Sequence, residues 1–330
     1  MIIELKNNTD SKQSEDFAAA HEGIRLFYNE RLLVVTPSSM KQTKPQFDSI
    51  IEKSWLMDSD IQLASRKFQA ETRNIKIGNY TSGMAQTLLT IGPCGVESEE
   101  MIEQTAQLII ETGLTSIRAG AFKPRTSPYS FQGMGEDGLK LLAKMRDKYG
   151  LSVVTEVRDS THIDMIIDYT DVVQIGAKAM YDHGILRACG QSQKPILIKR
   201  GFGTTLQEFV QAAEFVLSGG NPNVMLCERG IRTFETKSRF TLDLCGVAYL
   251  KENTNLPVIL DPSHAMGYSY GVPDLARACM AMGVDGLLIE VHPNPMLAKS
   301  DAAQQLTHNQ FRALFETLKP IANAVGRSII

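Results

Sequence analysis

Residues 196–226, ILIKRGFGTTLQEFVQAAEFVLSGGNPNVML, decide the fold class. Apolar runs at 196–198 and 224–226 are strand-sized, and the stretch between them, 206–217, has the apolar spacing of an amphipathic helix. Short aliphatic runs that alternate with helices are typical of parallel strands buried on both faces of a sheet. The stretch therefore predicts a β-α-β unit of an α/β protein.

The same alternation continues on both sides of this unit. A helix is predicted between Ser98, its N-cap, and Gly113. The other apolar runs are at 88–91, 117, 153–154, 172–175, 258–260 and 287–289, and the other amphipathic stretches are at 139–148, 162–168, 240–250, 273–282 and 310–325. Eight such units in about 240 residues predict a (β/α)8 TIM barrel rather than an open doubly wound sheet. A dinucleotide-binding fold is disfavoured because no GxGxxG follows the first strand.

The first 75 residues have a different pattern. Short strands are expected at 2–5, 24–27, 32–36 and 61–68, and short helices at 14–21 and 47–51. The order β-α-β-β-α-β is typical of a small α+β ferredoxin-like domain. We therefore divide the chain into residues 1–75 and a barrel domain, 76–330. A linker over 69–82, with a short strand at 75–77, spans the boundary.

Composition limits the function classes. The net charge of -3 gives no basis for nucleic-acid binding, and the apolar runs are far too short for a membrane span. The N-terminus lacks the basic region and apolar core of a signal peptide. Five cysteines without a CxxC pair indicate reduced thiols. These features predict a cytoplasmic enzyme or binding protein that acts on small molecules.

Polar residues follow nearly every predicted barrel strand, where barrel enzymes place their chemistry. One group offers a thiolate, an imidazole and two carboxylates, a set suited to a divalent transition metal: Cys94, His264, Glu290 and Asp301. A second group is cationic and fits an anionic ligand with phosphate groups: Arg118, Lys123, Arg125, Lys178, Lys199, Arg200 and Arg229. Glu156, Gln174, Glu228 and His292 lie at further strand ends.

The loop 120–133, GAFKPRTSPYSFQG, concentrates this pattern. Lys123, Arg125, Thr126 and Ser127 place two cations and two hydroxyls within five residues, between two prolines that stiffen the chain. Arginine can grip a phosphate with two parallel hydrogen bonds, and hydroxyls add donors. The loop is therefore interpreted as a phosphate-binding element, although a solvated surface loop is the alternative for this stretch alone.

Seven ordered motifs closely resemble the type Iβ group of 3-deoxy-D-arabino-heptulosonate 7-phosphate (DAHP) synthases, over residues 86–326. The motifs are IGPC (91–94), KPRTSPYSFQG (123–133), VTE (154–156), QIGA (174–177), LCERG (226–230), DPSH (261–264) and IEVHP (289–293). The resemblance implies condensation of phosphoenolpyruvate with erythrose 4-phosphate, the first step of the shikimate pathway. It also implies that the N-terminal domain is regulatory, with an aromatic amino acid as effector, and that the chain forms a homodimer or homotetramer.

The resemblance also implies residue roles. The metal ligands are Cys94, His264, Glu290 and Asp301, and the metal is Mn, Fe, Co or Zn. Phosphoenolpyruvate is held by Arg118, Lys123, Lys199 and Arg229, with Gln174 and Lys178 in the same pocket. Arg125 and Thr126 hold the phosphate of the aldose, and Ser127 also binds substrate. Lys123 is the proton donor, and Glu156 and the metal orient water.

Two departures from the family pattern leave room for a different aldose phosphate. Lys178 stands where arginine is usual, and Gly95 stands where serine is usual. The alternatives are a 3-deoxy-D-manno-octulosonate 8-phosphate synthase, Schiff-base aldol chemistry through Lys199, and an inactive barrel that serves a ligand-sensing N-terminal domain.

Overall fold

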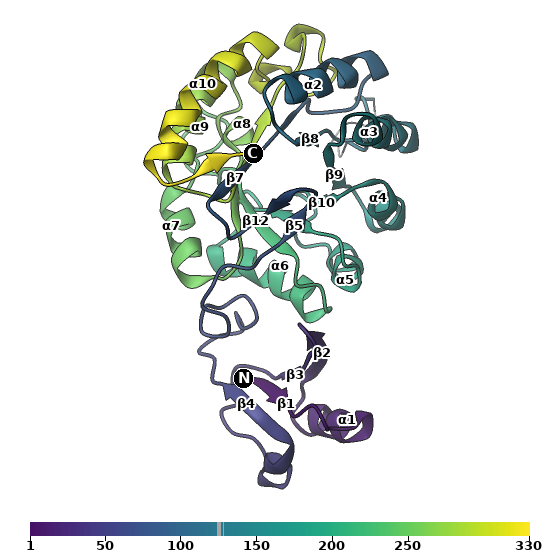
Figure 1. The fold of residues 1–330 in the computed structure, drawn as a ribbon, viewed down its shortest axis with the longest axis vertical. Coiled ribbons are helices and arrows are strands. Elements are labelled where there is room, and N and C mark those ends of the chain that lie inside the picture. The colour runs from purple at the N-terminus through teal and green to yellow at the C-terminus, as the bar shows by residue number, and fades with distance from the viewer. Residues whose placement is uncertain (124–126, 128) are drawn as a thin grey trace.

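Eight parallel strands form a closed barrel in this computed structural model, which describes residues 1–123, 127 and 129–330 (Figure 1). Each strand pairs with the next in sequence, and the last pairs with the first through Leu287 and Leu89. All eight predicted runs lie on these strands. The strands are β7 (Gln86–Gly92), β8 (Ser116–Arg118), β9 (Ser152–Val157), β10 (Val172–Ile175), β11 (Ile196–Lys199), β12 (Val224–Glu228), β13 (Val258–Leu260) and β14 (Gly286–Glu290).

Helices surround the barrel, and their apolar faces are buried against it (Figure 1). They are α2 (Glu99–Glu111), α3 (Glu136–Tyr149), α4 (Ile163–Tyr169), α5 (His183–Gln191), α6 (Leu206–Ser218), α7 (Leu244–Asn253), α8 (Pro262–Met266), α9 (Val272–Ala281) and α10 (His308–Ala324). The predicted N-cap of α2 is confirmed, because the Ser98 side chain accepts a hydrogen bond from Met101 N. The sequence analysis missed α5 and α8, which are short; α5 also contains two glycines.

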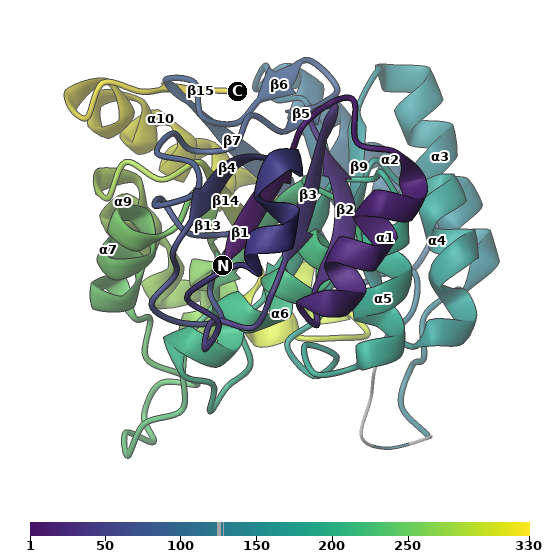
Figure 2. The ribbon, with the colours of Figure 1, turned by 90° about the horizontal axis from the view of Figure 1, so that it is seen from below.

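One end of the barrel is closed by a hairpin, β5 (Lys76–Ile77) and β6 (Tyr80–Thr81). Ile77 and Tyr80 pack against inward-facing strand residues, and the Tyr80 hydroxyl donates to Asp285 O at 2.8 Å. The hairpin lies at the same end as the C-terminal strand β15 (Ser328–Ile329), which pairs with β7 (Figure 2). Access to the barrel centre is therefore from the opposite end, where the parallel strands terminate.

The N-terminal residues form a separate four-stranded antiparallel sheet, which lies below the barrel in Figure 1. Its strands are β1 (Ile2–Leu5), β2 (Ile24–Tyr28), β3 (Arg31–Val35) and β4 (Ile51–Trp55), in the order β2-β3-β1-β4. Helix α1 (Ser11–Ala20) buries Phe17 against the sheet, and a 3-10 helix at Pro45–Ile50 replaces the second predicted helix. No helix among the described residues is both long and apolar enough to cross a membrane.

The strand predicted at 61–68 is wrong, because the fourth strand is β4 at Ile51–Trp55 and residues 61–68 form turns against the barrel. Three backbone N–H groups of this segment donate to a side chain rather than to a neighbouring strand. The Glu214 carboxylate, on α6, accepts from the N–H groups of residues 62, 63 and 64 at 2.7, 3.2 and 2.8 Å. A carboxylate from a distant part of the chain therefore takes the place of the neighbouring strand that the apolar pattern predicted.

Replacing Glu214 by Ala is expected to lower the free energy of unfolding by about 2 to 3 kcal/mol, because three backbone N–H groups lose their acceptor. Urea unfolding monitored by circular dichroism measures the change. Gln207→Ala, an exposed position on the same helix, is the control for lost helix surface and should change stability by less than about 0.5 kcal/mol. Equal effects of the two substitutions would contradict the assignment.

Candidate active site

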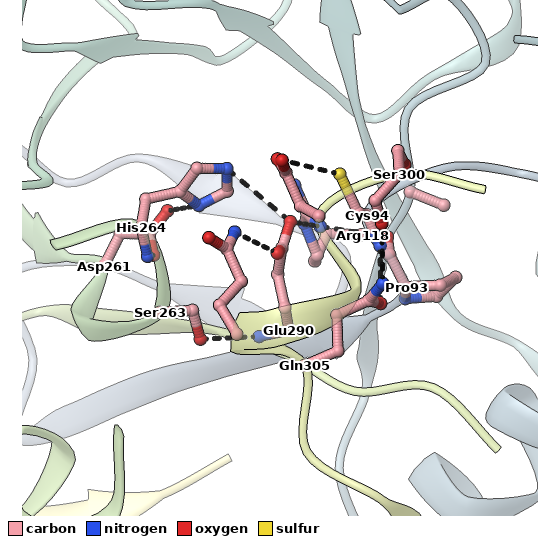
Figure 3. Close-up of polar contacts among 12 residues, drawn as sticks. Pro93, Cys94, Arg118, Asp261, Ser263, His264, Glu290, Ser300 and Gln305 are labelled. Atoms are coloured by element: carbon pink, nitrogen blue, oxygen red, sulfur yellow. Dashed lines mark hydrogen bonds and ion pairs between the residues drawn. The ribbon is translucent and has the colours of Figure 1, made fainter. Parts of the chain in front are cut away.

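Three predicted metal ligands lie together at the open end of the barrel (Figure 3). Cys94 is on the loop after β7, Glu290 ends β14, and Asp301 is on the loop that follows. Their ligand atoms all lie within 4.8 Å of one another, and Cys94 Sγ is 3.4 Å from Asp301 Oδ2. The structure therefore brings together residues that are about 200 positions apart in the chain.

His264, the fourth predicted ligand, points its ring toward the same cluster (Figure 3). It is on the short helix α8, and its Nε2 lies 3.6 Å from Glu290 Oε1. The other ring nitrogen, Nδ1, lies 2.8 Å from Asp261 Oδ2, and Asp261 Oδ1 accepts from the His264 backbone N–H at 2.9 Å. Asp261 thus orients the imidazole so that Nε2 faces the carboxylates, an arrangement typical of histidine metal ligands.

The electrostatics of the cluster fit a divalent cation. Burial raises the pKa of the Cys94 thiol to about 12, and the neighbouring Glu290 carboxylate adds to the shift. Burial also disfavours the charged form of Glu290, but His264 and Arg118 outweigh it and lower the pKa of that carboxyl. A buried thiol beside two carboxylates and an imidazole offers soft and hard donors, a set that suits a divalent transition metal. A cation bound there would favour the thiolate.

Two cations flank the cluster. Arg118, at the end of β8, donates to Glu290 Oε1 at 2.6 Å and to Pro93 O at 2.9 Å. The Lys123 ammonium lies 2.9 Å from both the carbonyl oxygen and the sulfur of Cys94. Burial opposes the charge of Lys123, but Cys94, Glu156 and Glu290 outweigh this effect and raise the pKa of its ammonium. Lys123 therefore stays protonated beside the cluster.

A cleft opens from the cluster toward solvent. It is lined mainly by charged side chains, six of them cationic or imidazole groups and two of them carboxylates, with one aromatic ring: Lys123, Glu156, Lys178, Lys199, Phe202, Arg229, Arg239, His264 and Asp301. Lys199 is held by Asp261 through an ion pair of 2.6 Å. The cleft therefore offers a positive surface for an anionic ligand next to the predicted metal ligands.

Arg229 lines the cleft, although most of its side chain is buried. Its guanidinium lies over the rings of Phe240 and Phe202, with its carbon 4.3 and 5.2 Å from the ring centroids. Its Nη1 has no hydrogen-bond acceptor among the described residues. A buried guanidinium N–H is costly without a partner, so this atom is a candidate contact for a bound anion.

Glu156 and Gln174 end adjacent strands and interact directly. Gln174 Nε2 donates to Glu156 Oε2 at 2.9 Å. A Cβ at position 176 would lie 2.2 Å from Glu156 Oε1, so the carboxylate can occupy this position only beside a glycine. Gln174 therefore orients Glu156 toward the cleft and is not itself among the cleft-lining residues that the structure describes.

Other predicted residues are placed differently. Arg200 is neutralised by Glu228 and Asp243 at 2.9 and 2.8 Å, so it is part of an internal ion-pair network rather than of the cleft. Ser127 is exposed and accepts from Tyr129 N. Arg125 and Thr126 lie outside the described residues. A Cβ on Gly95 would make only ordinary contacts, the shortest 3.4 Å from Ser300 Oγ, so the backbone leaves room for the usual serine.

The sequence analysis assigned no role to four polar residues that contact the cluster. Asp261 is the aspartate of the DPSH motif, whose role was left unassigned. Arg239, Gln304 and Gln305 follow no strand directly, and no motif in the sequence marked them. Gln304 donates to Glu290 Oε2 and accepts from Arg239 Nη1 at 2.7 Å, and Gln305 accepts from Cys94 N at 3.0 Å.

Comparisons with known proteins agree with this geometry. Residues 64–326 match the DAHP synthetase I family. A phospho-2-dehydro-3-deoxyheptonate aldolase of Thermotoga maritima is 43% identical over 265 residues, which cover 80% of this chain and 78% of the relative. A 2-dehydro-3-deoxyphosphooctonate aldolase of Bordetella petrii is 32% identical over 264 residues, which cover 73% of this chain and 92% of the relative.

Solved structures give the same result over a longer range. The crystal structure of the Thermotoga maritima DAHP synthase superimposes with a TM-score of 0.82 and 36% identity, and the match covers 100% of this chain and 99% of that one. A truncated form of the Thermotoga maritima enzyme matches 81% of this chain and 98% of its own length, with a TM-score of 0.76 and 38% identity. The chain belongs to the DAHP synthetase I family.

Proposed function

We propose that this protein is a DAHP synthase, a transferase that condenses phosphoenolpyruvate with erythrose 4-phosphate and releases phosphate. The observation that carries the proposal is the cluster of Cys94, Glu290 and Asp301 beside a cationic cleft. Family membership and 43% identity to a phospho-2-dehydro-3-deoxyheptonate aldolase support it. An inactive barrel is disfavoured because the described ligand atoms converge and the cleft has kept its cations.

Cys94, His264, Glu290 and Asp301 would hold a divalent metal ion, Mn, Fe, Co or Zn. When bound, the ion would supply a Lewis acid that polarises the aldehyde of the aldose phosphate. The protein's own contribution is to fix the donors: Asp261 orients His264, and Arg118 and Gln304 hold the Glu290 carboxylate. These contacts support the four-residue ligand set.

Phosphoenolpyruvate would bind in the cationic cleft. Lys199 and Arg229 line it, and the unpartnered Nη1 of Arg229 would donate to the phosphate or carboxylate. Lys178 would add positive charge to the lining of the cleft. Arg118, which donates to Glu290, would add positive charge next to that carboxylate. Arg125 and Thr126 would hold the phosphate of erythrose 4-phosphate, and Ser127 would also bind substrate, which stays a proposal from the sequence motif alone.

The reaction would form a bond between C3 of phosphoenolpyruvate and the aldehyde carbon. Lys123 would donate a proton to the oxygen that develops negative charge, since its ammonium is protonated and faces the cluster. Water would then add its oxygen to C2, with Glu156 accepting a proton from it. The resulting hemiketal phosphate would expel inorganic phosphate and leave the C2 carbonyl.

The test is phosphate release from phosphoenolpyruvate with a panel of aldose phosphates and a divalent metal. We expect erythrose 4-phosphate to give the highest kcat/KM. A preference for arabinose 5-phosphate would favour the second candidate, a 3-deoxy-octulosonate phosphate synthase, which is supported by the relatives about 32% identical to this chain. No phosphate release with any aldose phosphate would favour the inactive barrel.

Schiff-base chemistry through Lys199 is disfavoured by its ion pair with Asp261, because a nucleophilic amine must be unprotonated. Borohydride treatment in the presence of substrate should therefore trap no covalent adduct. A trapped adduct at Lys199 would overturn the metal-dependent mechanism.

We also infer that the N-terminal sheet is a ferredoxin-like regulatory domain of the type Iβ group, with a boundary near residue 75. The strand order β2-β3-β1-β4 and the β-α-β-β-(3-10)-β element order support this inference. An aromatic amino acid would be the effector, and the protein would act in the cytoplasm as a homodimer or homotetramer.

Removing the N-terminal sheet should leave catalysis and abolish feedback inhibition. The cut is best placed after residue 58, because residues 62–64 donate to Glu214 and Leu63 O accepts from Asn255 on the barrel. Steady-state assays with and without tyrosine or phenylalanine measure the result. Full-length protein that is inhibited, together with a truncated form that is equally inhibited, would refute the regulatory assignment.

A further inference from the structure

The loop that carries Cys94 and the loop that carries Asp301 meet at the open end of the barrel. The distance between these two side chains therefore depends on contacts between the loops. Asp301 has a φ of +46°, a left-handed conformation that is unfavourable for a residue other than glycine. Such a conformation persists only where surrounding contacts hold it. The position of the Asp301 carboxylate therefore depends on the contacts of its neighbours in the loop.

The side chain of Gln305 spans the two loops (Figure 3). Its Oε1 accepts from the backbone N–H of Cys94 at 3.0 Å, and its Nε2 donates to the carbonyl oxygen of Ser300 at 3.0 Å. Gln305 is 1% exposed, so water does not compete for these hydrogen bonds. One planar amide thus joins the backbone of one candidate ligand to the residue that precedes another.

The neighbouring residue, Gln304, continues the same arrangement. It is also 1% exposed, and its amide lies between Glu290 and Arg239. Arg239 in turn lies 3.9 Å from Asp301 Oδ2. Gln304 therefore touches a candidate ligand side chain directly, whereas Gln305 acts through the backbone of the ligand-bearing loops.

We propose that Gln305 is a positioning residue that sets the distance between Cys94 and Asp301 for metal binding. The proposal rests on the proposed function, in which these two residues are metal ligands. Without the amide, the Cys94 N–H and the Ser300 carbonyl would lose their buried partners, and the two loops would be free to separate. Contacts behind metal ligands commonly tune affinity by about 10- to 100-fold.

The test is titration of the metal-free full-length protein with Co²⁺, monitored by the thiolate-to-cobalt charge-transfer absorption. Gln305→Leu is expected to weaken Co²⁺ affinity about 10- to 100-fold and to shift or weaken the band. Activity of the variant should recover as the Co²⁺ concentration is raised. Gln305 is expected to affect mainly the affinity for metal and much less the kcat of the metal-saturated enzyme. Gln62→Leu is the matched control, a buried glutamine in the N-terminal part that donates to Thr36 O, and it should leave the band and affinity unchanged.

Gln305→Glu keeps the acceptor for Cys94 N–H but places a carboxylate oxygen against Ser300 O, so it should also weaken Co²⁺ binding and serves if the leucine variant does not fold. Wild-type affinity and an unchanged band in the folded variants would overturn the positioning role while leaving the proposed function intact. A wild-type protein that binds Co²⁺ with no thiolate band would instead overturn the ligand set, and the positioning role with it.

Discussion

Replacing Cys94 by Ala is expected to abolish measurable metal-dependent turnover, with kcat/KM lowered by at least about 10³-fold, or about 4 kcal/mol of transition-state stabilisation. Cys94 provides the soft donor of a cluster whose ligand atoms lie within 4.8 Å of one another. Alanine removes that donor and leaves two carboxylates and an imidazole, which bind a transition metal less tightly. Steady-state phosphate release and isothermal titration with Mn²⁺ or Zn²⁺ measure both effects.

The matched control is Cys189→Ala, because Cys189 is equally buried but lies in the apolar core on α5. Its substitution should cost some stability and leave kcat/KM and metal affinity near the wild-type values. A chelator should stop turnover of the wild-type protein, and added metal should restore it. Full activity of the Cys94 variant, or of wild-type protein in excess chelator, would remove the metal from the mechanism.

The barrel could be predicted from the sequence because its signal is local. Each strand is a short run of aliphatic residues, buried on both faces, and each run is followed by a helix or a turn. The C-terminal strand ends then meet by topology alone, so Cys94 and Glu290 could be placed at one site without knowledge of any distance. His264 followed in the same way from its position just after β13.

The parts that failed depend on tertiary contacts. The apolar residues of segment 61–68 resemble a strand, but the carboxylate of Glu214, about 150 residues later, takes its backbone N–H groups. Arg200 looks like a substrate contact in the sequence, and only the structure shows that Glu228 and Asp243 neutralise it. Local patterns record burial, and they do not record which distant polar group satisfies a backbone or a charge.

The supporting residues of the site were hidden for a related reason. Gln304 and Gln305 lie in a polar stretch, QQ, that is typical of an exposed loop, yet both side chains are 1% exposed. Gln305 is buried where the loops after β7 and β14 meet, and Asp301, four residues before it, has a left-handed backbone. Neither feature has a signature in a single sequence.

Replacing Lys123 by Met should lower kcat by about 10² to 10⁴-fold, the usual contribution of a general acid. The ammonium of Lys123 lies 2.9 Å from Cys94 Sγ and lines the cleft, so it faces the place where the aldehyde oxygen would develop charge. Methionine has a similar length and fills the buried space without a proton to give. Rapid-quench measurement of a single turnover separates this chemical step from product release.

The control is Lys251→Met, a partly buried lysine that donates to Gly283 O and lies outside the cleft, and it should leave kcat unchanged. Lys123→Arg separates charge from proton donation, because arginine stays positive but does not give up its proton at neutral pH. If Lys123 is the acid, the arginine variant should bind phosphoenolpyruvate yet remain slow in the chemical step. If its charge alone matters, arginine should restore most of the rate that methionine loses, and the proton would then have to come from another group in the cleft.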